Sequence, residues 1–206
     1  MAKTPSSKQW LKEHFDDVWV RKAQEAGYRS RAAFKLVEIN QKDRLLRPGT
    51  VVVDLGAAPG GWSQVAEQLV KPGGLVLASD ILDMEPVDGV DFIKGDFTEE
   101  SVFNEILQAL GGRQVDLVMS DMAPNLSGMN DIDQPRAMYL VELAVDFASQ
   151  TLRPGGSLLM KVFQGEGFNE LLRDLKTRFG TVVNRKPEAS RSRSREVYVL
   201  AKDFRA

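Results

Sequence analysis

Four aspartates of this chain closely follow short apolar runs that are typical of buried strands. Asp54 follows residues 51–53, Asp80 follows 75–79, Asp96 follows 90–93 and Asp121 follows 115–120. In open α/β sheets, ligands bind beyond the carboxyl ends of the strands. We therefore expect the four carboxylates to line one site, where they could hold hydroxyls or a cationic group. The alternative is that each is a cap or turn residue.

The turn after the first run is rich in glycine and reads Asp54-Leu55-Gly56-Ala57-Ala58-Pro59-Gly60-Gly61-Trp62. Glycine allows a sharp turn and a close approach of the backbone to a ligand. The spacing differs from the G-x-G-x-x-G pattern that receives a dinucleotide pyrophosphate, which disfavours a nicotinamide oxidoreductase. S-Adenosylmethionine carries a sulfonium and an ammonium but no phosphate, so an acid-rich pocket suits it. The alternative is a tight strand-to-helix turn without a ligand.

The predicted cofactor site combines this turn with the strand-end acids. Asp80 is the candidate partner of the ribose hydroxyls, and Asp96 could face the adenine. The predicted cofactor-binding residues are Asp54, Gly56, Pro59, Gly60, Trp62, Asp80, Asp96 and Asp121.

One lysine stands out because it interrupts an apolar run. Lys161 lies within residues 158–163, which are otherwise all apolar. A lysine inside a buried strand is costly unless it is paired. The alternative is an edge-strand lysine whose ammonium reaches solvent.

The elements that must position these residues alternate between strands and helices. We predict strands at residues 51–55, 75–79, 90–93, 115–120, 157–163, 181–185 and 196–201. Helices are expected at 31–46, 62–70, 98–110, 134–151 and 169–178, with Ser30 and Thr98 as caps of the first and third. In the first helix, Phe34 and Val37 are expected to face the core.

This alternation predicts an α/β protein with a seven-stranded, mostly parallel sheet covered on both faces. The last two strands are too close in sequence for a helical crossover, so the last strand should run antiparallel. Such a sheet resembles the class I S-adenosylmethionine-dependent methyltransferase (Rossmann-like) fold.

The composition excludes several kinds of chemistry. The 206 residues include no cysteine and one histidine, His14, so disulfides, thiolate or histidine metal sites and a Ser-His triad are not expected. We predict no metal. No apolar stretch is long enough to cross a bilayer, and the N-terminus lacks an apolar signal segment. We expect a cytoplasmic monomer without membrane contact.

The near-neutral total charge of −2 hides two basic ends. Residues 1–47 carry +5 and residues 184–206 carry +4, whereas residues 48–183 carry −11. Basic segments are candidates for phosphate contact, although solvated surface charge is the alternative. We predict a basic RNA-contacting extension at 1–29 and a methyltransferase domain at 30–206. The candidate RNA-binding residues are Arg29, Arg31, Arg191, Arg193 and Arg195.

Three motifs together resemble the FtsJ/RrmJ family of RNA ribose 2′-O-methyltransferases. They are the glycine turn, Ser120-Asp121-Met122-Ala123-Pro124-Asn125 and Lys161-Val162-Phe163. The resemblance spans nearly the whole chain. It implies S-adenosyl-L-methionine as cofactor and a catalytic tetrad of Lys35, Asp121, Lys161 and Glu196. Without the family, Lys35 and Glu196 look like surface residues.

The resemblance also implies the substrate, a uridine of 23S rRNA in the peptidyl-transferase region of the large (50S) ribosomal subunit. Lys161 is the candidate proton acceptor during in-line methyl transfer to the 2′-hydroxyl, or it stays charged and orients that hydroxyl. Other readings are a 2′-O-methyltransferase of tRNA or another RNA, a methyltransferase of a protein or small molecule, and a non-catalytic RNA-binding module.

Overall fold

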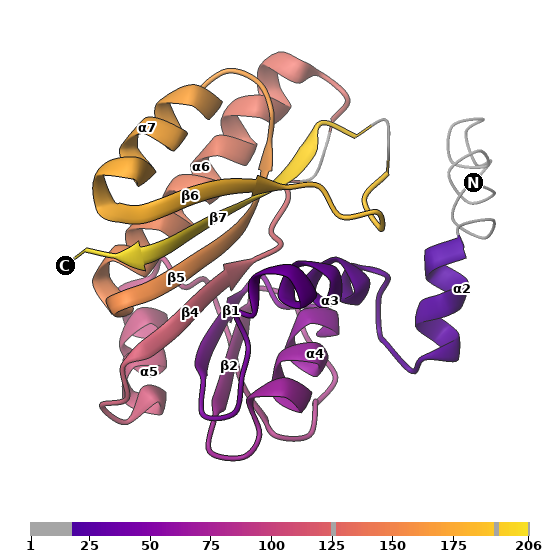
Figure 1. Cartoon of the computed structure of the whole chain (residues 1–206), viewed down its shortest axis with the longest axis vertical. Coiled ribbons are helices and arrows are strands. Elements are labelled where there is room, and N and C mark those ends of the chain that lie inside the picture. The colour runs from indigo at the N-terminus through magenta and orange to yellow at the C-terminus, as the bar shows by residue number, and fades with distance from the viewer. Residues whose placement is uncertain (1–17, 125–126, 192–193, 206) are drawn as a thin grey trace.

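The computed structural model describes residues 18–124, 127–191 and 194–205. At its centre is a seven-stranded sheet with the order β3-β2-β1-β4-β5-β7-β6 (Figure 1). The strands are β1 (Val51–Leu55), β2 (Leu75–Asp80), β3 (Val90–Lys94), β4 (Val115–Ser120), β5 (Leu152–Phe163), β6 (Phe179–Arg185) and β7 (Glu196–Phe204). β1 to β5 pair in parallel, whereas β7 runs antiparallel to both β5 and β6. The predicted α/β sheet with an antiparallel last strand is confirmed.

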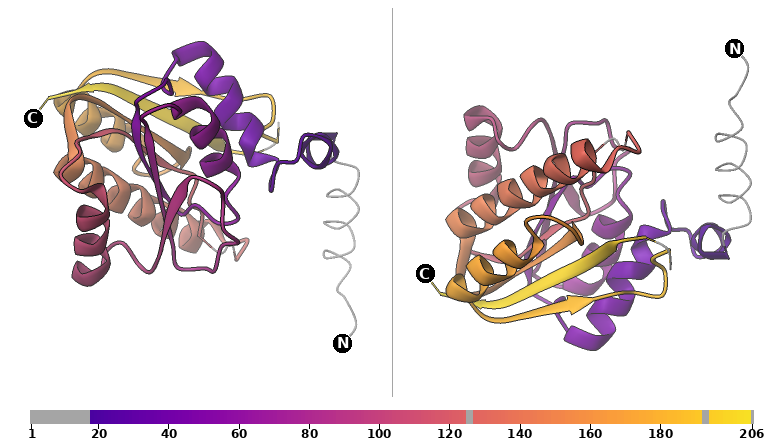
Figure 2. Two further views of the ribbon diagram at one scale, coloured as in Figure 1. Left: turned by 90° about the horizontal axis from the view of Figure 1, so that it is seen from below. Right: turned by 90° about the horizontal axis from the view of Figure 1, so that it is seen from above.

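Helices cover both faces of this sheet, as Figure 2 shows from below and from above. α3 and α4 lie on one face, and α5, α6 and α7 lie on the other. The helices are α2 (Val18–Glu25), α3 (Ala32–Asp43), α4 (Gly61–Val70), α5 (Glu100–Leu110), α6 (Asn130–Thr151) and α7 (Phe168–Arg178). The protein therefore has the two helical layers that a mainly parallel sheet requires.

Successive residues of each strand face opposite helical layers. In β5, Leu158 and Met160 pack with α5, α6 and α7, whereas Leu159 packs with α3 and α4. This alternation places Lys161 on the same face as Leu159, toward α3. The face that a strand residue occupies thus decides which helix can supply its partner.

The first predicted helix is shorter than expected and presents a different face. α3 ends at Asp43 because Arg44 takes a left-handed backbone conformation, and Ser30 provides no side-chain cap. The buried residues are Ala33, Lys35, Leu36 and Ile39. Val37 is half-buried and packs against the core as predicted, whereas the prediction that Phe34 faces the core is wrong. Phe34 instead packs against two aromatic rings, Trp19 of α2 at 5.3 Å and Tyr28 at 5.5 Å. Phe34 therefore does not follow the 3.6-residue periodicity of the core-facing residues, because α2 covers its side of α3.

Other element boundaries also differ from the predictions. α5 begins at Glu100 because the hydroxyl and backbone N–H of Thr98 are bound by Asp96, so Thr98 is not its cap. α6 begins four residues earlier than expected, at Asn130. β5 begins at Leu152, which pairs with Val115 across an irregularity in the ladder.

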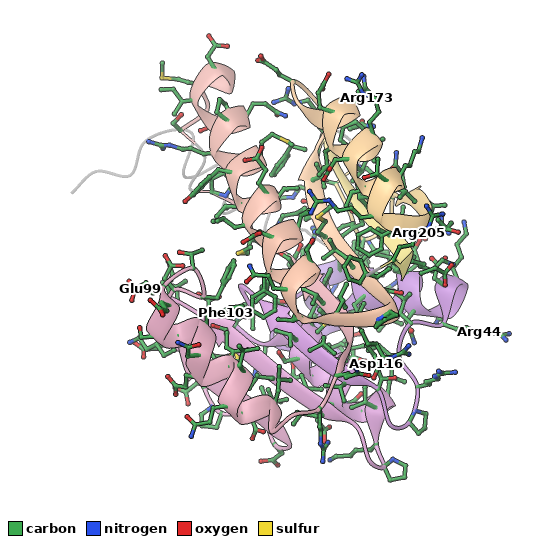
Figure 3. All side chains as sticks on the ribbon, turned by 90° about the vertical axis from the view of Figure 1, so that its left-hand side faces the viewer. Arg44, Glu99, Phe103, Asp116, Arg173 and Arg205 are labelled. Atoms are coloured by element: carbon green, nitrogen blue, oxygen red, sulfur yellow. The ribbon has the colours of Figure 1, made fainter. Side chains whose placement is uncertain are left out.

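Contacts at the end of the sheet where β1 and β4 begin fix the strands relative to one another. Asp116, which is labelled in Figure 3, lies at the start of β4. It accepts hydrogen bonds from the backbone N–H of Val51 at 2.8 Å and from Nε of Arg153 at 2.6 Å. On the α5 side, Phe103 lies edge-on to Phe147 of α6 with 5.5 Å between ring centroids.

Among the described helices, none is long and apolar enough to cross a membrane.

Candidate active site

Lys161 and Asp121 meet at the carboxyl edge of the sheet. β4 and β5 are parallel neighbours, so the residue that follows β4 lies beside the end of β5. Nζ of Lys161 donates to the backbone carbonyl of Asp121 at 2.5 Å and lies 3.2 Å from its Oδ1. The side chain of Lys161 is 8% exposed. The buried ammonium therefore has the partners that its burial requires.

Lys35 and Glu196 form a second pair beside the first. Nζ of Lys35 donates to Oε1 of Glu196 at 2.6 Å, although 161 positions separate the two residues in the sequence. Their side chains are only 10% and 14% exposed, so the interpretation of both as surface residues is wrong. The pairing arises because β7 lies between β5 and β6 in the sheet and packs against α3. No local sequence pattern reveals this contact.

Tyr198 connects the two pairs, and sequence reasoning missed it. Its hydroxyl donates to Oδ1 of Asp121 at 2.7 Å and accepts from Nζ of Lys35 at 2.8 Å. Tyr198 is the cross-strand neighbour of Lys161 and is fully buried. Burial raises the pKa of its phenol, and the charges of Asp121 and Glu196 raise it further. A possible signal was its spacing, since a tyrosine two residues after Glu196 shares its face of the strand.

A cavity of about 580 Å³ opens next to Asp121. Of the predicted cofactor residues, it is lined by Gly56, Asp80, Asp96 and Asp121. The lining also includes apolar side chains, among them Phe97, Met122 and Leu140, and the cationic side chain of Arg136. Such a lining suits a nucleoside that carries a cationic chain, because carboxylates can accept hydrogen bonds from hydroxyls and ammonium groups while apolar side chains contact a base.

The carboxylates of the cavity also shape its walls. Asp80 accepts hydrogen bonds at 2.8 Å from the backbone N–H groups of Ala58 and Leu82. Gly56 has a positive φ of 72°, and a Cβ there would lie 2.2 Å from Cγ of Met122. A glycine is therefore required at position 56 because Met122, in the segment after β4, packs against it. This requirement holds whether or not a ligand is bound.

The remaining predicted cofactor residues, Asp54, Pro59, Gly60 and Trp62, are not part of the cavity lining. Asp54 is buried behind the turn, where Oγ of Ser63 donates to its Oδ2 at 2.6 Å. Burial raises the pKa of Asp54 to about 7, and the charges of Asp121 and Asp80 act in the same direction. Trp62 donates from Nε1 to the carbonyl of Ala32 and packs against Tyr198 at 5.6 Å. Asp54 therefore stabilises the turn through Ser63, and Trp62 packs against the tyrosine that contacts the tetrad.

The arginines predicted to contact RNA have different surroundings. Arg29 donates to the carbonyl of Pro59 in the glycine turn and to those of Glu85 and Pro86 between β2 and β3. Arg31 donates to the carbonyl of Ala189. Arg191 lies close enough to lower the pKa of Arg31, after the larger effect of burial. Arg195 precedes β7, and its carbonyl accepts from the N–H of Gln164. Arg193 lies outside the described residues, as do residues 1–17 of the predicted extension.

Comparison with known proteins identifies the family. A family model described as FtsJ-like methyltransferase matches residues 28–204. The chain belongs to the FtsJ-like methyltransferase family. The predicted resemblance and the methyltransferase fold are therefore confirmed.

Within the described residues, no cluster of three or more histidine or acidic side chains could hold a metal ion.

Several relatives of this family carry one name, Ribosomal RNA large subunit methyltransferase E. The protein of Cellvibrio japonicus is 62% identical over 99% of this chain and 97% of its own length. That of Pseudomonas aeruginosa PAO1 is 58% identical over 100% of this chain and 99% of its own. A crystal structure of a ribosomal RNA methyltransferase from Plasmodium falciparum is 30% identical, covers 86% of this chain and 98% of its own, and superposes with a TM-score of 0.77.

Proposed function

We propose that this protein uses S-adenosylmethionine to methylate the 2′-hydroxyl of a uridine in 23S rRNA, within the peptidyl-transferase region of the large ribosomal subunit. We further propose that it acts as a monomer in the cytoplasm. The names of its relatives support the choice of large-subunit rRNA. The observation that carries the proposal is one continuous set of polar contacts, from Glu196 through Lys35, Tyr198 and Asp121 to Lys161, at the edge of the cavity.

The cavity fits the cofactor in size and in chemistry. When bound, S-adenosylmethionine supplies a methyl group on a sulfonium, which is already activated for attack by an oxygen. Asp80 and Asp96 would accept hydrogen bonds from its hydroxyl and amino groups, and Asp121 would attract its cationic end. Met122 and Phe97 would provide the apolar walls.

The tetrad would prepare the acceptor hydroxyl. We assign Lys161 as the group whose Nζ would take the hydroxyl proton, as the oxygen bonds to the methyl carbon and the bond from that carbon to the sulfonium sulfur breaks. Asp121 holds this side chain through its backbone carbonyl and its carboxylate. A neutral amine is needed for this role. In the alternative mechanism, a charged Lys161 orients the lone pair of the hydroxyl.

Lys35, Glu196 and Tyr198 would act by positioning. Lys35 is held by Glu196 and Tyr198, and Tyr198 in turn holds Asp121. Positioning of reacting groups supplies a large part of the acceleration in such transfers. A non-catalytic RNA-binding module would have no need for four charged side chains that are at most 19% exposed and are joined through a tyrosine hydroxyl, so this network favours an enzyme.

The test is to incubate the protein with methyl-labelled S-adenosylmethionine and large ribosomal subunits that lack this modification. We expect label on a 2′-oxygen of a single uridine of 23S rRNA, mapped by nuclease digestion and mass spectrometry. Small subunits and tRNA serve as controls. Label on a base, on protein, or only on tRNA would contradict the proposal.

A further inference from the structure

Arg29 connects two segments that are remote in sequence and border the cavity. Its Nη1 donates to the carbonyl of Pro59, 30 positions away, at 3.2 Å. Nη1 also donates to the carbonyl of Glu85, and Nη2 donates to that of Pro86, 57 positions away. Pro59 belongs to the glycine turn, and Glu85 and Pro86 belong to the segment between β2 and β3. One guanidinium therefore ties the two segments together.

The two segments that Arg29 joins form one wall of the cavity. Ala58 of the turn and Ile81 and Leu82 of the second segment line it. Asp80 joins the same segments on the cavity side, through the N–H groups of Ala58 and Leu82. The wall is therefore fixed twice, by a carboxylate on its inner side and by Arg29 on its outer side.

Close packing surrounds the guanidinium where it meets the turn. A Cβ on Gly60 would lie 3.2 Å from Nη1 of Arg29 and 3.0 Å from Sδ of Met84. Met84 is itself buried against Ala57 of the turn. A side chain at position 60 would therefore press on both the arginine and the second segment.

The backbone of Arg29 is also fixed, by α4. Its N–H donates to Oε1 of Gln64 at 2.9 Å, and Nε2 of Gln64 donates to the carbonyl of Gly27 at 3.3 Å. A guanidinium has five N–H donors, and these are the groups that would donate hydrogen bonds to an RNA phosphate. Those of Arg29 face three carbonyls of its own chain, so the geometry is that of an internal clamp.

We infer that Arg29 is a positioning residue for the cofactor wall, and that it sets the affinity for S-adenosylmethionine rather than the affinity for RNA. The inference rests on the proposed function, which identifies the ligand of the cavity. It reassigns a residue that the sequence places among the RNA contacts.

The test uses the full-length variant Arg29→Lys, which keeps the charge but has a single nitrogen in place of the two terminal nitrogens that reach these carbonyls. Binding of S-adenosylmethionine is measured by calorimetry, and binding of 23S rRNA fragments by filter assay at several salt concentrations. We expect an affinity for S-adenosylmethionine about tenfold weaker and a correspondingly raised KM for it. The kcat at saturating cofactor, the RNA affinity and its salt dependence should stay at wild-type values.

Arg153→Lys is the matched control. Arg153 also bonds a backbone carbonyl and helps to fix strands, but it lies at the opposite edge of the sheet. This variant should lower the melting temperature without changing the affinity for S-adenosylmethionine. Gln64→Met removes the acceptor for the Arg29 N–H, and should weaken cofactor binding about threefold.

Three outcomes would overturn the inference. In the first, Arg29→Lys weakens RNA binding and leaves cofactor affinity unchanged, which makes Arg29 a phosphate contact. In the second, both Arg29→Lys and Gln64→Met behave like Arg153→Lys, which makes the clamp purely structural. In the third, the wild-type protein does not bind S-adenosylmethionine, which overturns the proposed function and this inference together.

Discussion

The two buried lysines of the site are stabilised in different ways. Lys35 has the carboxylate of Glu196 and the phenol of Tyr198 as partners, whereas Lys161 has the backbone carbonyl and the carboxylate of Asp121. Lys161 thus contacts Asp121, which lines the cavity, whereas Lys35 reaches Asp121 only through Tyr198. This difference is why we assign the proton transfer to Lys161 and positioning to Lys35.

Replacing Lys161 by methionine should separate chemistry from cofactor binding. The variant keeps much of the side-chain volume but has no proton acceptor, so turnover should fall by about 10²–10⁴-fold. Affinity for S-adenosylmethionine should stay within about twofold, since Lys161 is not part of the cavity lining. Single-turnover methylation of large subunits and calorimetry measure the two quantities. A rate near that of the wild type would contradict the assigned role.

Asp54 should make the stability of the protein depend on pH. Its pKa rises from 3.8 in a free side chain to about 7 in the folded protein. The folded state therefore holds the proton more tightly than the unfolded chain does. The stabilisation that Asp54 contributes is complete below its unfolded pKa and is lost as the pH rises through about 7.

Asp54→Asn tests this dependence because asparagine is neutral at every pH and similar in shape. The free energy of unfolding of the variant, relative to wild type, should rise by on the order of 2–3 kcal/mol between about pH 5 and about pH 8. Urea denaturation at several pH values measures it. A difference that does not change with pH would show that Asp54 is ionised in the folded protein throughout.

At the scale of elements, the first turns of α6 hold the loops on both sides of the site. Asp133 accepts bonds from the backbone N–H and hydroxyl of Ser127 and from the N–H of Gly128, which lower its pKa. Gln134 donates to the carbonyl of Phe163, the last residue of β5, and to that of Glu166 in the loop that follows. The loops that follow Asp121 and Lys161 are therefore both fixed to one helical turn.

The contact between Gln134 and Gly165 gives a test of this arrangement. A Cβ on Gly165 would lie 2.7 Å from Cδ of Gln134, so Gly165→Ala should displace the amide and slow methylation by about tenfold. In a Gln134→Ala background the added methyl has room, so the second substitution should cost little more. Gln150→Ala, at an exposed position of the same helix, is the control. Additive losses in the double variant would contradict the proposed coupling.

At the scale of the molecule, the charge distribution should govern RNA binding. Basic ends surround an acidic middle that contains the cavity, and both ends lead to tetrad members, Lys35 and Glu196. Contacts to phosphates release bound cations, so RNA affinity should fall steeply as salt rises. Filter binding at about 50–200 mM salt should give a slope near −0.7 for each phosphate contact. An affinity independent of salt would exclude the basic ends as phosphate contacts.

Most of the fold could be predicted because its signals are local. The apolar runs gave every strand of the sheet, and the short spacing before β7 gave its direction. The errors have two physical causes, a tertiary contact in one case and a competing local hydrogen bond in the other. Phe34 is covered by α2 rather than by the sheet, and Asp96 takes the hydrogen bonds that would have made Thr98 a cap.

The sequence by itself determined the chemistry that is available: a glycine turn, acids at the ends of successive strands, and a lysine in an apolar run. Such features are short-range, since the end of a strand and the start of a turn are encoded by neighbouring residues. Only the tertiary structure decided which of them meet. Gly56, Asp80, Asp96 and Asp121 line the cavity, whereas Asp54 supports the turn from behind. Lys35 and Glu196 become buried partners, and Tyr198 joins them to Asp121, because the sheet brings together residues up to 163 positions apart.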